Sequence, residues 1–245
     1  MSNRKTRSWA VPLKGDVFGM EDLPLYLDGS QVTVAKREDK YFLLLPVEVV
    51  GDSYELVTES ATSYLSLING AASLLIDGYR PVSLEGGVFH GIDEQGNISQ
   101  VVVPVSTADI RCKLNGGTIS INGELQPDHR TGSLNLLIIN ATGHQAKADA
   151  LVLLSRSSPS WSELYLVYEL VESNVGSRMF TDGWIGKAKA AQFTRTANSY
   201  TALGAAGRHG KDSGAPPAKI MEKHSAELLI RSLVASWFQE TLETA

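Results

Sequence analysis

The hydrophobic period of this chain changes near residue 130, and this change constrains the fold more than any other feature. Before it, apolar residues occur in short runs between turn residues, and residues 41–50 (YFLLLPVEVV) are almost continuously apolar, which is typical of a strand covered on both faces. From residue 133 onward, apolar residues recur every three or four positions, as in amphipathic helices. We therefore predict an α+β fold. An N-terminal, mostly antiparallel β-sheet domain with one packed helix spans residues 1–132, and a C-terminal all-α helical bundle spans residues 133–245.

Turn residues divide the N-terminal region into strand segments. Pro46 limits the apolar run at 41–50, because proline cannot donate a hydrogen bond to a sheet ladder. Short apolar segments also flank three groups of turn residues, at 28–29, 93–97 and 115–117. This arrangement is typical of hairpins and predicts three paired segments: 25–27 with 32–34, 88–92 with 98–103, and 111–114 with 118–121.

Helical spacing predicts one helix in the N-terminal domain and four in the C-terminal domain. The first covers residues 58–75, with Thr58 as its capping residue. In the second region, Thr142 and Gln145 have the spacing of a capping box, and Ser160 follows a break and provides a new cap. The four helices are expected at residues 142–154, 161–171, 187–200 and 223–242, which is a suitable number for a small bundle.

Several functional classes lack their sequence signatures in this chain. No phosphate-binding glycine loop, nucleophile elbow or closely spaced Cys/His set occurs, so we expect no cofactor and no metal. The single cysteine, Cys112, cannot form a disulfide within the chain and fits a reducing compartment. No apolar segment is long enough to span a membrane, and the N-terminus lacks the apolar stretch of a signal peptide. We therefore expect a cytoplasmic protein with no membrane partner.

Basic residues concentrate in one window, residues 185–224. Seven Lys or Arg residues stand there against two acidic ones, a net charge of +5, whereas the chain carries −5 and its remainder −10. A basic surface of this kind can neutralise phosphates, so RNA is a candidate partner. A solvated face with scattered lysines remains the alternative. The candidate binding residues are Lys187, Lys189 and Lys211.

The stretch at 195–217 (RTANSYTALGAAGRHGKDSGAPP) contains an adjacent Arg208-His209 pair. Glycines on either side predict that the preceding helix has ended, so both side chains are free to face one ligand. Histidine titrates near neutrality and arginine binds phosphate through forked donors, as metal-free RNA cleavage requires. The alternatives are a binding site without catalysis, and a pair of cations that only stabilises the end of a helix.

Several motifs of residues 145–240 resemble a group of uncharacterised bacterial proteins with a HEPN-like helical domain. They are Trp161-Ser-Glu-Leu-Tyr165, Gly183-Trp184, Phe193-Thr-Arg-Thr-Ala-Asn198, Arg208-His209-Gly210 and Pro216-Pro217 with Met221, followed by a final helix. The resemblance implies a metal-independent ribonuclease, paired across a dimer, or a related domain that has lost catalysis and binds a partner. HEPN nucleases place several residues between Arg and His, whereas here the two are adjacent. Only Arg208 and His209, supported by Asn198, carry over as site residues.

Two functional hypotheses follow. The first is a non-enzymatic recognition or assembly module of a bacterial system, related to antiphage defence or toxins, which acts through its helical domain. The second is a HEPN-like ribonuclease that uses His209 and Arg208 as catalytic residues. The partner is a second protein or a second copy of this chain, because aromatic residues are enriched in interface cores and the helical region carries five at Tyr165, Tyr168, Trp184, Trp237 and Phe238.

Overall fold

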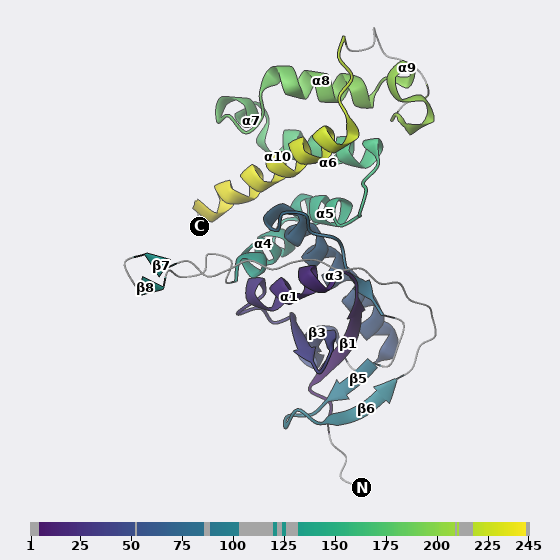
Figure 1. Cartoon of the computed structure of the whole chain (residues 1–245), viewed down its shortest axis with the longest axis vertical. Coiled ribbons are helices and arrows are strands. Elements are labelled where there is room, and N and C mark those ends of the chain that lie inside the picture. The colour runs from purple at the N-terminus through teal and green to yellow at the C-terminus, as the bar shows by residue number, and fades with distance from the viewer. Residues whose placement is uncertain are drawn as a thin grey trace. The chain divides into compact units, whose positions relative to one another are not determined.

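The computed structural model describes residues 5–51, 53–85, 89–102, 120–121, 124–125, 132–208, 210 and 218–243 (Figure 1). The chain divides into two compact units, Met1–Ile138 and Ile139–Ala245. The predicted domain boundary, between residues 132 and 133, stands just before helix α4 (Ser133–Thr142), and the division into units falls inside that helix. The predicted combination of an antiparallel sheet followed by a mostly helical region is confirmed.

The first unit is built on a six-stranded sheet in the order β2-β3-β1-β5-β6, with β4 paired to β1, and every pairing is antiparallel. In β1 the five residues from Trp9 to Leu13 are all buried, as expected for a strand covered on both faces. The bounds are β1 Ser8–Lys14, β2 Thr33–Arg37, β3 Lys40–Pro46, β4 Ser83–Leu84, β5 Phe89–Ile92 and β6 Ile98–Val102. A separate two-stranded sheet joins β7 (Ser120–Ile121) to β8 (Glu124–Leu125).

Three predictions about these strands have different outcomes. The hairpin at 88–103 is confirmed as β5 and β6, and the buried Asp93 closes its loop by accepting hydrogen bonds from the Gln95 and Asn97 N–H groups. Pro46 does end the strand at 41–50, and the short helix α2 (Val47–Val50) follows. The predicted hairpin at 111–121 lies outside the described residues, apart from residues 120–121 in β7.

The predicted strand at 25–27 is wrong. Residues 17–26 form helix α1, because Met20, Leu23 and Leu27 supply a buried stripe at helical spacing that outweighs the local strand pattern. Asp28-Gly29 is still a turn, with Gly29 at a positive φ of 74°, but it connects a helix to β2.

The expected helix at 58–75 is present and begins earlier, as α3 (Tyr54–Leu75). Ser53, and not Thr58, caps it by accepting a hydrogen bond from the Leu56 N–H. The helix contacts β3 and β4, and its buried face consists mainly of Val57, Ala61, Leu65, Ile68 and Ala72. The first unit therefore contains α1 and α2 in addition to the one helix that the sequence predicted.

In the second unit, every regular element among the described residues is helical. Helix α6 is central, since it contacts α5, α7, α8 and α10. Ser160 caps it in a complete capping box with Glu163, as the break at this point predicted. The bounds are α5 Gln145–Leu154, α6 Trp161–Val175, α7 Arg178–Thr181, α8 Lys187–Ala197, α9 Tyr200–Leu203 and α10 Lys223–Glu243, with a 3₁₀ turn at Gly204–Ala206.

The predicted capping box at 142–145 does not form. Thr142 is the last residue of α4, and its hydroxyl donates to the Ile139 carbonyl, while the Gln145 amide donates to Asp149. His144 occupies the cap position of α5 without a side-chain hydrogen bond. Helix α4, which the sequence pattern did not predict, therefore includes Thr142, the residue expected to begin the next helix.

None of the helices in the described ranges has both the length and the apolar composition that crossing a bilayer requires.

The second unit encloses a charged side chain, Lys147 of α5, which is only 1% exposed. Its Nζ donates to Asn140 Oδ1 at 2.7 Å and to the Trp237 carbonyl at 3.4 Å. It also lies 4.8 Å from the ring centre of Phe238 and 5.3 Å from that of Trp237. Burial lowers the pKa of this amine to about 8, because the charged form has lost most of its hydration.

Lys147 should make the stability of the protein depend on pH. Its folded pKa lies below the unfolded value of 10.5, so the unfolded chain binds more protons between pH 8 and 10.5, and stability should rise with pH in this window. Relative to Lys147→Met, the wild-type free energy of unfolding should increase by about 2 kcal/mol between pH 7.5 and 9.5. Urea titrations of both proteins at several pH values measure this difference. Parallel pH profiles would contradict it.

Candidate functional site

Arg208 is held by three contacts at the end of α8. Its guanidinium carbon lies 4.1 Å from the ring centre of Tyr165, and one of its nitrogens lies 3.3 Å from Glu169 Oε2. Its backbone N–H donates to the carbonyl of Ala197, the last residue of α8, at 2.8 Å. The main chain of Arg208 thus supplies the hydrogen bond that the Ala197 carbonyl lacks within the helix. The Arg208 side chain stacks on Tyr165 of α6 and is 31% exposed.

Asn198 lies beside this arrangement as the residue that ends α8. Its N–H donates to the Thr194 carbonyl, and its side-chain Oδ1 is buried with no hydrogen-bond partner among the described residues. The structure therefore brings Asn198 and Arg208 to the same helix end. His209 and Lys211 lie outside the described residues, so their predicted roles stay predictions.

Aromatic residues of two motifs that carry the resemblance, at 161–165 and 193–198, form a cluster between α6 and α8 together with Tyr168. Phe193 of α8 is fully buried, and its ring centre lies 5.8–6.2 Å from those of Trp161, Tyr165 and Tyr168. Arg208 covers the Tyr165 ring of this cluster. These spacings are within the range of favourable aromatic pairs, so the conspicuous residues of these motifs pack the two helices together.

Some of the aromatic residues proposed for a dimer interface are buried within the chain itself. Tyr168, Trp237 and Phe238 are at most 4% exposed, while Tyr165 and Trp184 are half-buried. Three of the five side chains therefore have no free surface to offer a second copy of the chain.

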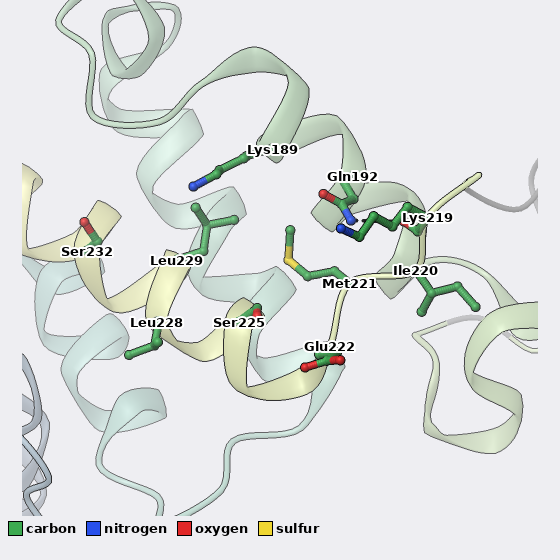
Figure 2. A pocket seen from close by; sticks show the side chains of 10 residues that line it. All are labelled: Lys189, Gln192, Lys219, Ile220, Met221, Glu222, Ser225, Leu228, Leu229 and Ser232. Atoms are coloured by element: carbon green, nitrogen blue, oxygen red, sulfur yellow. Dashed lines mark hydrogen bonds between the residues drawn. The ribbon is translucent and has the colours of Figure 1, made fainter.

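A groove that the sequence did not indicate lies between α8 and the first half of α10 (Figure 2). Its volume is about 630 Å³. Its apolar lining comes from the segment before α10 and from α10 itself, and consists of Ile220, Met221, Leu228 and Leu229. Its polar lining consists of Lys189, Gln192, Lys219, Glu222, Ser225 and Ser232. We call this hollow the α8–α10 groove.

Two hydrogen bonds fix the segment that leads into α10. The Gln192 side chain donates to the Lys219 carbonyl at 3.1 Å (Figure 2). The Met221 N–H donates to the buried hydroxyl oxygen of Thr196 at 3.1 Å. Two side chains of α8 therefore hold the main chain of residues 219–221, and this joins the two sides of the groove.

The groove's two lysines and two further cations of α8 have no neutralising partner in the described part of the chain. Lys187, Lys189, Arg195 and Lys219 are exposed, and no carboxylate in the described part of the chain lies within ion-pair distance of any of them. Lys187 lies 6.0 Å from the Phe180 ring centre. Arg195 and Lys219 also line a smaller hollow of about 250 Å³ that shares Gln192 with the groove. Glu222 is the one carboxylate among the groove's lining residues.

One feature of the sequence becomes informative only when the buried face of α10 is known. On α10 the residues Ala226, Ile230, Leu233 and Trp237 form the buried face, and Leu228 lies off that face with 56% of its surface exposed. Ile220, just before the helix, is 50% exposed. Exposed aliphatic residues beside lysines of the basic window are typical of a binding surface, because packing within the helical unit does not account for them.

Among the residues that the structure describes, no three His, Cys, Asp or Glu side chains gather as metal ligands would. Comparison with known proteins adds no relative, since no family model, curated protein or solved structure matches this chain.

The contacts of Arg208 make a prediction about stability. Arg208→Ala should lower the free energy of unfolding by about 1–2 kcal/mol, because it removes a partly buried cation–π stack and an ion pair. Arg208→Lys should cost nearly as much, since an ammonium cannot stack as a planar guanidinium does. The control Arg195→Ala, at an exposed and unpaired position, should cost less than about 0.5 kcal/mol. Urea denaturation measures all three, and a wild-type value for Arg208→Lys would mean that the stack contributes nothing.

Proposed function

We propose that this protein is a non-enzymatic recognition module that binds an anionic partner through the α8–α10 groove of its helical unit. The observation that carries the proposal is the combination of unpaired Lys189 and Lys219 with a partly exposed aliphatic lining in one concave surface. Binding sites are concave and largely apolar, with a few polar groups that orient the ligand. A volume of about 630 Å³ is of the size that such sites have.

The charge of this surface supports an anionic partner. Exposed lysines without a carboxylate at ion-pair distance are not neutralised by direct pairing, and complementary charge speeds encounter and rejects partners of the wrong sign. The chain as a whole carries a net charge of −5, so the basic window is a local exception. An anionic partner would therefore be directed to this face of the molecule.

The alternative, a metal-independent ribonuclease, has less support. Its phosphate-binding cation would be Arg208, which needs free donors directed at the substrate. The guanidinium instead stacks on Tyr165 and lies 3.3 Å from Glu169 Oε2. The negative charge of this carboxylate would repel a phosphate bound at the same guanidinium. These contacts are those of a residue that organises the end of α8.

The proposal extends to the finer expectations from the sequence. The helical unit would be an all-α bundle of the HEPN-like type, in a cytoplasmic protein of a bacterial defence or toxin-related system; these parts rest on the sequence resemblance. A different protein is preferred to a second copy as the partner, because Tyr168, Trp237 and Phe238 are already buried within the chain.

Site-specific crosslinking tests the groove as a binding surface. Leu228 is replaced by the photoreactive residue benzoylphenylalanine, and the purified full chain is irradiated in a lysate of the source organism. We expect a discrete adduct that disappears in the Lys189→Glu/Lys219→Glu background, because the lysines provide the attraction. The same photoreactive residue at Leu166 of α6, which is 47% exposed, is the matched control and should give no such adduct.

The absence of an adduct at position 228, or equal adducts at positions 228 and 166, would refute the groove as the binding site. Digestion of the adduct with protease or ribonuclease identifies the partner as protein or RNA, and either result is compatible with a recognition module.

A nuclease assay separates the module from the enzyme. We expect the purified wild-type chain to leave total RNA intact in excess chelator, because Arg208 is committed to Tyr165 and Glu169. Fragment lengths on a denaturing gel are the measurement, with a metal-independent ribonuclease as the positive control. Cleavage that is lost in His209→Ala, with the fold retained by circular dichroism, would overturn the non-enzymatic proposal in favour of the ribonuclease.

A further inference from the structure

We propose that the occupant of the α8–α10 groove is an acidic amphipathic helix of a partner protein. This inference rests on the proposed function and adds the chemical class of the partner. Three features of the groove carry it: the kind of apolar side chain that lines it, the sign and position of its charges, and the backbone elements around it.

The apolar lining is aliphatic. Ile220, Met221, Leu228 and Leu229 provide it, and none of the described residues that line the groove is aromatic. Proteins that bind single-stranded RNA stack its bases on aromatic rings, and this stacking contributes a large share of their affinity. Flexible aliphatic and thioether side chains instead match leucine-like anchors of a peptide. The lining therefore favours a protein segment over RNA.

The positive charges of the groove come from Lys189 of α8 and from Lys219, and Glu222 adds a negative charge on the segment before α10. Figure 2 shows Lys189 and Gln192 reaching from α8 on one side, and Leu228 on α10 on the other. Lys219 and, in the adjoining hollow, Arg195 extend the basic side. A ligand that fits has apolar residues along one face and carboxylates beside them, which is the pattern of an amphipathic helix with an acidic flank.

The backbone around the groove selects among the ways in which a peptide can bind. Addition of a strand needs a free sheet edge, and the regular elements described in residues 139–245 are all helical. Proline-rich segments dock in grooves lined with aromatic side chains, and the lining that the structure describes here contains none. A helix that inserts residues at i, i+3, i+4 and i+7 needs only an apolar groove between helices, which is present.

Displayed peptides test the inference. A phage library of random peptides of about 16 residues, roughly four helical turns, is selected on the immobilised full chain and depleted on the Lys189→Glu/Lys219→Glu variant. We expect enriched sequences with aliphatic residues at helical spacing and an excess of Asp and Glu. The Kd of a synthetic representative, measured by fluorescence anisotropy, should rise with added salt, because exposed charges are screened.

Variants identify the groove as the place of binding. Leu228→Asp and Lys189→Glu/Lys219→Glu should each weaken the peptide about tenfold or more, and the milder Lys189→Gln/Lys219→Gln should weaken it less. The matched controls, Leu166→Asp on α6 and Lys5→Glu/Lys36→Glu at exposed lysines of the other unit, should leave the Kd within about twofold. Thermal melts confirm that each variant is folded.

Three results would overturn the inference: no enriched peptide, enriched peptides without acidic excess, or a Kd that Leu228→Asp does not change. A parallel titration with an oligouridylate of about 12 nucleotides distinguishes the sources of negative charge. Groove-dependent binding of this RNA without any enriched peptide refutes the helix and preserves the recognition module. Absence of a crosslinked adduct at position 228 refutes the module itself.

Discussion

The packing of Phe193 among Trp161, Tyr165 and Tyr168 is the interaction on which the rest of the helical unit's surface depends. It attaches α8 to the central helix α6 through four rings, and α8 carries Lys189, Gln192 and the Asn198 end of the candidate site. Thr196, three residues further along α8, accepts the Met221 N–H and thereby sets where the chain enters α10. The groove depends on aromatic rings that hold α8 against α6, and on two α8 side chains that bond the main chain of residues 219–221.

Arg208 illustrates why a motif does not define chemistry. A guanidinium has a planar, weakly hydrated surface and five donors, so the same residue stacks on a ring as readily as it binds a phosphate. The adjacent Arg-His pair was compatible with both uses. The three-dimensional neighbours decide between them, since Tyr165 and Glu169 precede Arg208 by about forty positions in the chain and occupy its face and its donors. Asn198, the other residue linked to this pair by sequence, ends α8 next to Ala197, whose carbonyl accepts the Arg208 N–H.

Periodicity was enough to predict the α+β order, helix α3, the β5–β6 hairpin and the final helix, because each is set by residues close together in sequence. It failed at residues 25–27, where the stripe of Met20, Leu23 and Leu27 begins before the segment that resembled a strand, and at Thr142, which belongs to a helix whose start was not recognised. Periodicity could not predict the groove, for a different reason. Its two sides are about thirty residues apart in the sequence, and its concave shape depends on how Gln192 and Thr196 hold residues 219–221.

The two kinds of side chain in the groove have different physical tasks. At physiological ionic strength the field of an exposed charge is screened within about 8 Å, so distant acidic residues of the chain do not cancel the attraction of Lys189 and Lys219 for a ligand in contact with them. Such charges mainly raise the association rate and exclude cationic partners, whereas apolar contacts retain a bound ligand. Leu228 and Ile220, each about half exposed, keep apolar surface in water that a partner would remove. A ligand that is only anionic would associate quickly but also dissociate quickly. A ligand that is only apolar would stay bound but would not be distinguished from other apolar ligands. The groove is therefore best matched by a ligand with both kinds of surface.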